Sequence, residues 1–102
     1  MFILELFLPL RDNHGQAFPR TVYASVRTEL AQHFGGVTAF MRSPAVGIWK
    51  DDGGTARHDE IVVFEVMCEE LEVEWWQTYR TQLERTFRQQ EILIRATRTT
   101  RI

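Results

Sequence analysis

The chain of 102 residues contains one cysteine, one lysine and three prolines. Because Cys68 is alone, no disulfide can form within the chain, and the reducing cytoplasm is the expected location. No apolar run approaches the roughly 18 residues that a membrane-spanning helix needs. The first residues lack the basic segment of a signal peptide. The net charge of -2 provides no general attraction to nucleic acid.

Motifs that mark common catalytic and cofactor sites are also absent. The sequence has no phosphate-binding glycine loop, no serine elbow, no CxxC pair and no dinucleotide fingerprint. His14 and His58 have neither of the metal-binding spacings HxxxH and HExxH, and residues 51–54 depart from the calcium-loop pattern. The sequence therefore predicts no metal site and no bound cofactor.

What the chain does have is the composition of one folded domain. Apolar residues make up 44% and charged residues 25%, which is typical of a folded chain and not of a disordered one. A chain of this length buries roughly two-thirds of its unfolded surface around one core. We therefore expect a single domain over residues 1–102.

Hydrophobic spacing divides the chain into six elements. Apolar residues that recur every four positions predict helices, and short apolar runs bounded by turn residues predict strands. Pro44 cannot donate a ladder hydrogen bond, so its strand is expected at a sheet edge with a bend or bulge. In chain order we expect a strand at 2–8, a helix at 19–34, strands at 37–49 and 61–68, a helix at 71–87 and a strand at 91–97.

The order β-α-β-β-α-β is that of the ferredoxin-like plait, an α+β fold. Right-handed crossovers place the first and third strands in the centre and the second and fourth at the edges. We therefore expect a four-stranded antiparallel sheet in the order 4-1-3-2, with both helices on one face.

The sheet face turned away from the helices, called the open face below, is also expected to be apolar. The alternation of side chains along the strands leaves six large apolar groups there. They would expose several hundred Å², about the limit for a monomer, so we expect a homodimer in which two such faces pack about a twofold axis. These residues are Ile3, Phe7, Ile61, Val63, Met67 and Leu93.

Three ionisable residues, called the polar row below, are expected on the same open face. Glu5, Glu65 and Arg95 lie near the midpoints of three neighbouring strands, and antiparallel pairing brings them roughly level. One interpretation is a polar site within the apolar dimer interface that holds or protonates a small ligand. The other is an ionic cluster that fixes the register of the dimer.

A second group of candidates lies where loops meet at one end of the sheet. Histidine with carboxylate neighbours can act as a general base, so His14 and His58 are the candidate catalytic residues. Exposed turns commonly carry the same residue types, so the pattern is not specific. The other candidates at this end are Arg11, Asp12, Trp49, Lys50 and Asp51.

Several other conspicuous residues are expected to serve structure. His33 lies near the end of the first helix, where a cation interacts favourably with the helix dipole. Cys68 lies on the core face without a basic neighbour, which disfavours a nucleophile. Trp75 is expected at a rim, where it packs against the core, lines a pocket or takes part in a subunit contact. Residues 51–74 carry nine acidic groups, and four of them lie where the second helix begins and stabilise it.

The layout resembles small bacterial ferredoxin-like proteins, including the dimeric α/β-barrel group. The segment GIWKDDG at 47–53, followed by EIVVF at 60–64, is also similar to a family of single-domain bacterial proteins of unassigned activity. The resemblance implies sheets that pair face to face. It also implies relatives that include cofactor-free monooxygenases, haem-degrading enzymes and stress-response proteins. No catalytic set carries over residue by residue, and no histidine has the placement of a haem ligand.

Two functions follow as expectations. The first is a cytoplasmic homodimer that binds a small ligand or a partner, with no assignable reaction. The alternative is a cofactor-independent monooxygenase or isomerase with His14 or His58 as the base. RNA binding is disfavoured because the open face has no exposed aromatic pair flanked by basic residues.

Overall fold

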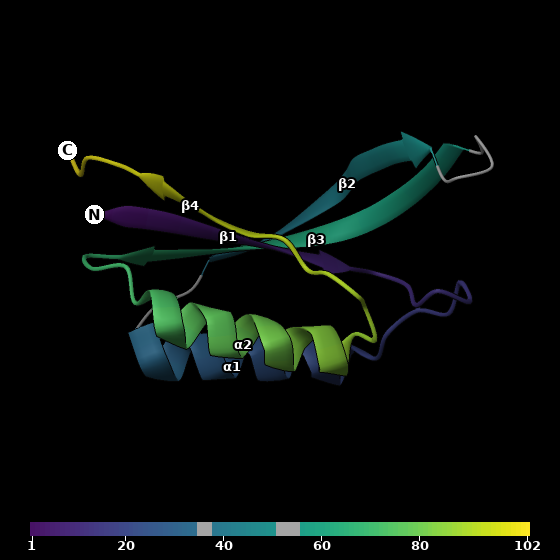
Figure 1. Ribbon diagram of the computed structural model, residues 1–102, viewed down its shortest axis with the longest axis horizontal. Coiled ribbons are helices and arrows are strands. Elements are labelled where there is room, and N and C mark those ends of the chain that lie inside the picture. Colours follow the sequence, from purple (N-terminus) through teal and green to yellow (C-terminus); the bar gives the residue numbers. More distant parts are fainter. Residues whose placement is uncertain (35–37, 51–55) are drawn as a thin grey trace.

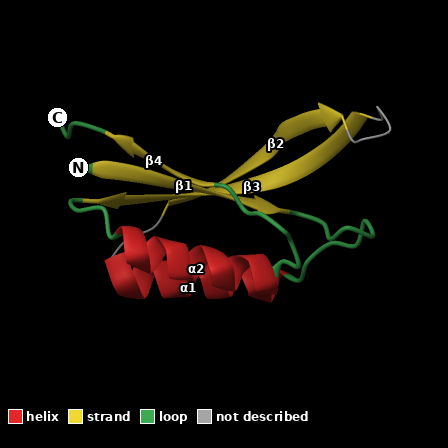
Figure 2. Ribbon diagram, in the orientation of Figure 1, coloured by secondary structure: helices red, strands yellow, loops and turns green. Residues whose placement is uncertain are grey.

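The computed structural model describes residues 1–34, 38–50 and 56–102, with the backbone alone for 38–50 and 56–60. The two helices lie side by side under one face of the sheet (Figures 1 and 2). The element order β-α-β-β-α-β and the α+β class are those expected from the sequence. The elements are β1 (Phe2–Pro9), α1 (Arg20–Phe34), β2 (Thr38–Lys50), β3 (Ala56–Cys68), α2 (Val73–Thr86) and β4 (Ile94–Arg98).

The expected plait with four strands side by side is wrong for most of the sheet. Hydrogen bonds link the strands in the order β2-β3-β1-β4, and every pairing is antiparallel. All four strands align only at the rows of Glu5 and Leu6, and the other rows of β1 contain three strands or fewer. The sheet is therefore three-stranded through most of β1, and beyond Ile61 it continues as the β2–β3 hairpin alone.

The narrow sheet has a physical cause at its β4 edge. The sequence pattern predicted this strand from residue 91, but it begins at Ile94 and pairs only with residues 2–6 of β1. Ile92 is buried, and its backbone N–H donates to Glu84 Oε2 at 3.1 Å. That N–H is therefore engaged by a side chain. The last backbone bond to β1 runs from the Phe7 N–H to the Leu93 carbonyl at 3.0 Å, and the residues before Leu93 connect α2 to the sheet.

The other edge strand is irregular where the sequence predicted it. The pairing of β2 with β3 shifts register between Phe40 and Ala45, the interval that contains Pro44. Proline has no N–H to donate, so the ladder is interrupted there. The bulge expected near Pro44 is confirmed.

The core lies between the sheet and the two helices. Leu4, Leu6 and Leu8 of β1 are buried, as their alternation predicted, and each fully buried leucine contributes roughly 2 kcal/mol. In α2 the helical spacing of apolar residues places Val73 on the same face as Trp76 and Leu83, but Val73 is 50% exposed while the other two are buried. The other buried residues of this core are Val26, Leu30, Val62, Phe64, Val66, Trp76, Leu83, Phe87 and Ile92.

A side-chain hydrogen bond joins α1 to the end of β1. The hydroxyl of Tyr23 donates to the carbonyl oxygen of Pro9 at 2.6 Å, and both groups are partly buried. Burial raises the pKa of Tyr23 to about 12. The hydroxyl therefore stays protonated and able to donate at any physiological pH.

We predict that Tyr23→Phe lowers the free energy of unfolding by about 1 kcal/mol, because the Pro9 carbonyl loses its donor. The folded-state pKa of Tyr23 lies above its unfolded value of about 10. This contribution is therefore complete below about pH 10 and is lost as the pH rises toward 12. Urea unfolding near pH 7 and near pH 11 measures both effects, and the difference between the two proteins should shrink at the higher pH. Equal unfolding midpoints near neutral pH would contradict the prediction.

Candidate functional site

The polar row lies on the open face as a connected group. Glu5 stands opposite Glu65 of β3 on one side and Arg95 of β4 on the other. Arg95 Nε donates to Glu5 Oε1 at 2.8 Å, with the two side chains 58% and 24% exposed. The Arg95 guanidinium also lies 5.0 Å from the centre of the Phe7 ring. The arginine is therefore held by a carboxylate and an aromatic ring together.

The third member of the polar row is differently placed. Glu65 is half-buried beside Glu5, and it forms no ion pair within the described part of the chain. Two carboxylates thus lie in one row with a single guanidinium, which binds only Glu5. The row is left with an excess negative charge, which favours a cation from outside the chain.

The apolar residues around the polar row are unequally covered. Met67 and Leu93 are 52% and 54% exposed, while Ile3, Phe7 and Ile61 are half-buried. Val63 was expected to be exposed on this face, but it is buried on the inner strand β3, with β1 and β2 on either side. The exposed apolar area of the open face therefore comes mainly from Met67 and Leu93, which is fewer residues than the alternation predicted.

At the loop end, the candidates within the described residues form a turn. The Asp12 carboxylate accepts backbone N–H groups of His14 at 2.8 Å and Gln16 at 2.9 Å. The bond from Gln16 is the main reason that the pKa of Asp12 is lowered. Arg11 donates to the Gly15 carbonyl at 3.2 Å, and Gly15 has a φ of 81°, which favours glycine. Asp12 therefore binds backbone groups and does not orient the exposed His14 ring.

The side chains of the remaining loop candidates lie outside the described part of the structure, so no contact between them and this turn is described. Trp49, Lys50 and His58 lie on the paired backbones of β2 and β3, but their side chains are outside the described part of the structure. Asp51 lies outside the described residues altogether.

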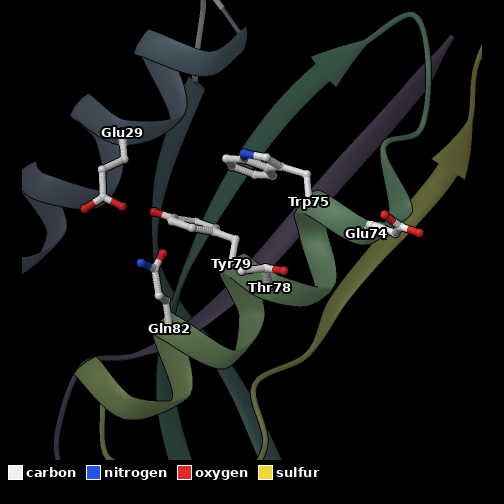
Figure 3. A pocket seen from close by; sticks show the side chains of 6 residues that line it. All are labelled: Glu29, Glu74, Trp75, Thr78, Tyr79 and Gln82. Carbon is white, nitrogen blue, oxygen red and sulfur yellow. The ribbon is translucent and has the colours of Figure 1, made fainter.

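A groove between the two helices was not predicted from the sequence. It has a volume of about 410 Å³ at one end and continues into a hollow of about 310 Å³ that shares Glu29, Tyr79 and Gln82. Figure 3 shows Glu29 of α1 facing Tyr79, Gln82 and Trp75 of α2, while Glu74 turns away. We call this the helix groove. It lies on the outer side of the helices, away from the sheet.

Tyr79 is the most unusual residue of the helix groove. Its side chain is 4% exposed, yet its hydroxyl has no hydrogen bond of good geometry to any described residue. Figure 3 shows that the hydroxyl points toward the Glu29 carboxylate. Burial in the first place, then the negative charge of Glu29, and last a side-chain interaction of the hydroxyl with Glu29 that falls short of hydrogen-bond geometry, raise the pKa of Tyr79. The phenol therefore remains neutral and retains a proton to donate.

Aromatic stacking fixes the wall of the helix groove. The Trp75 ring is stacked between His33, 4.2 Å away at 6°, and Tyr79, 4.9 Å away at 22°. His33 Nε2 lies 3.0 Å from Glu72 Oε2. Trp75 does line a pocket, one of the roles expected for it. His33 therefore has specific partners in addition to its place near the end of the helix.

A third hollow, of about 510 Å³, lies beside His33 and Cys68. Burial in the first place, and then the charge of Glu72, raise the pKa of Cys68, which disfavours the thiolate. Within the described residues, no three His, Cys, Asp or Glu side chains are placed to hold a metal ion. The part of the chain that is described contains no helix long and apolar enough to cross a membrane.

Comparison with known proteins identifies the fold and no more. No family model and no curated protein matches the chain. A solved phage SAM lyase in complex with S-methyl-5'-thioadenosine matches with a TM-score of 0.61 and 14% identity, over 94% of this chain and 79% of that one. A phage SAM lyase in its apo state matches with a TM-score of 0.56 and 15% identity, over 94% and 78%.

We predict that the Asp12 side chain stabilises this turn and that the His14 side chain does not. Asp12→Ala should speed hydrogen exchange at the amides of His14 and Gln16, because both lose their acceptor. His14→Ala is the matched control, since only the backbone of this residue takes part, and exchange at Gln16 should be unchanged. Equal effects of the two substitutions on the Gln16 amide would show that Asp12 does not hold the turn.

Proposed function

We propose that the chain is a small-molecule-binding protein that forms a homodimer through its open face and holds its ligand beside the polar row. The observation that carries this proposal is the row of two carboxylates, Glu5 and Glu65, with a single arginine, Arg95, which binds only Glu5, on a partly apolar surface. On one open face alone, a ligand would remain in contact with water on its outer side. A second copy would enclose it.

The fold neighbours supply the class of ligand to test first. They are phage SAM lyases, one of them in complex with S-methyl-5'-thioadenosine. SAM is a sulfonium ion, and a fixed positive charge is stabilised by a carboxylate that lacks a partner, such as Glu65. The uncharged thioether nucleoside would rely on apolar contacts with Phe7 and Met67. The proposed ligand is therefore a nucleoside that carries a thioether or sulfonium group.

Charge complementarity supports a second copy as the occupant of the open face. A twofold axis places the same surface on both sides of the contact. Arg95 of one protomer, 58% exposed, can then reach Glu65 of the partner subunit. Met67 and Leu93 provide exposed apolar area for the contact. Two facing rows would together contain four carboxylates and two guanidinium groups, so an excess negative charge would remain for a cationic ligand.

The alternative of an enzyme with His14 as base receives no support from the geometry. The Asp12 carboxylate accepts backbone N–H groups, and the His14 side chain is exposed. A general base needs a partner that orients its ring.

For the assembly, we predict that the protein sediments as a dimer at micromolar concentration and that Met67→Glu or Leu93→Glu converts it to a monomer. The new carboxylate would be buried against apolar surface in the dimer but hydrated in the monomer. The matched control is Val73→Glu, an equally exposed apolar residue on α2, which should leave the dimer intact. A wild-type protein that sediments only as a 12.0 kDa monomer would refute the assembly.

For the ligand, we predict that SAM and S-methyl-5'-thioadenosine both bind the wild-type protein in isothermal titration calorimetry. Glu65→Gln should weaken SAM about tenfold, or about 1.4 kcal/mol, and the uncharged nucleoside less, because only SAM loses a charge partner. Glu91→Gln, an exposed glutamate that precedes β4, is the control and should change neither affinity. Failure of both nucleosides to bind, or equal weakening of both by Glu65→Gln, would contradict the proposed ligand class.

A further inference from the structure

We infer that the helix groove is a second ligand site, separate from the open face, and that it binds a primary alkylammonium ion with Glu29 as its anionic partner. The groove opens on the side of the helices that faces away from the sheet (Figure 3). Its residues play no part in the polar row, so the inference is independent of the proposed function.

The charge of the helix groove selects a cation. Glu29 faces the groove from α1, and among the described residues that line it there is no lysine, arginine or histidine. Glu29 is exposed and hydrated, and its charge repels an anion, attracts a cation and gives a neutral ligand no comparable gain. A cation is the ligand that this lining favours.

The unpartnered hydroxyl of Tyr79 is the independent sign that the groove is incomplete without a ligand. Nearly all buried polar atoms in folded proteins have a hydrogen-bond partner, so a buried hydroxyl without one requires an explanation. Glu29 is close enough to affect the phenol but does not form a well-aligned bond with it. A cation that draws the Glu29 carboxylate over Tyr79 would give the hydroxyl its acceptor.

The remaining walls of the groove define the kind of cation. An ammonium group has three N–H donors, and the side-chain oxygens of Glu29 and Gln82 both lie toward the hydroxyl end of Tyr79, where they can accept from it (Figure 3). In the continuing hollow the lining includes Val22, Val26 and Leu83, which suit a hydrocarbon chain. A bare metal ion would make no use of this apolar part. The geometry points to an ammonium group on a short aliphatic chain.

The test is a calorimetric titration of the wild-type protein with n-butylamine and with 1,4-diaminobutane, against n-butanol and butyrate as isosteric neutral and anionic probes. We expect the amines to bind and the other two probes not to bind. Binding of butyrate or butanol as tight as that of butylamine would overturn the inference, since the groove would then recognise only the hydrocarbon chain.

Variants locate the binding in the groove. Glu29→Gln should weaken butylamine at least tenfold, and the exposed control Glu91→Gln should leave it unchanged. Tyr79→Phe removes the unpartnered hydroxyl, so it should raise the melting temperature of the free protein and reduce the further rise that butylamine causes. Amine affinity that Glu29→Gln leaves at the wild-type value would refute the site.

A further variant separates this inference from the proposed function. Met67→Glu alters the open face and leaves the helix groove untouched, so it should bind butylamine with wild-type affinity whatever its oligomeric state. Loss of amine binding in Met67→Glu would show that the amine occupies the open face, and the groove site would be wrong even if the dimer exists.

Discussion

The alternation of β1 is the constraint on which the rest of the structure depends. Leu4, Leu6 and Leu8 are each at most 1% exposed, and they belong to the buried sheet face that packs against both helices. A shift of one residue in register would turn all three toward water and bring Glu5 into the core. Glu5 and Phe7 are therefore on the open face because the leucines must be on the other. The polar row follows from the same alternation in β3 and β4.

Local periodicity predicted much of the fold, and contacts distant in sequence determined what it missed. Both helices and the core face of each central strand follow from spacing along a single element. The width of the sheet, meaning the number of strands paired at each row of β1, does not follow from such spacing. It depends on where β4 begins, and that is set by the bond from the Ile92 N–H to Glu84 and by the route of the chain away from α2. No pattern within residues 91–97 distinguishes paired residues from those of the connection.

Of the candidate sites, the polar row follows in part from local sequence pattern, whereas the helix groove depends on contacts between distant residues. The contact of Glu5 with Arg95 could be predicted because antiparallel pairing aligns strand midpoints, and the structure brings the two together. The helix groove could not, because Glu29 and Tyr79 belong to different helices and meet only through the packing of those helices. In the sequence, Tyr79 is one of three aromatic residues of α2, and nothing there distinguishes it from the other two. The unpartnered hydroxyl that makes it informative exists only in three dimensions.

The acidic segment that dominates the charge pattern shows why composition alone misleads. Nine carboxylates between residues 51 and 74 suggest one acidic surface, but the described ones are distributed among different environments. Glu65 lies on the open face, Glu72 pairs with His33, and Glu74 turns away from the helix groove. The carboxylate that faces the groove, Glu29, lies outside the acidic segment. A close-packed core of Leu30, Leu83 and their neighbours separates the open face from the groove, so each site must be judged by its own lining and not by the charge of the chain.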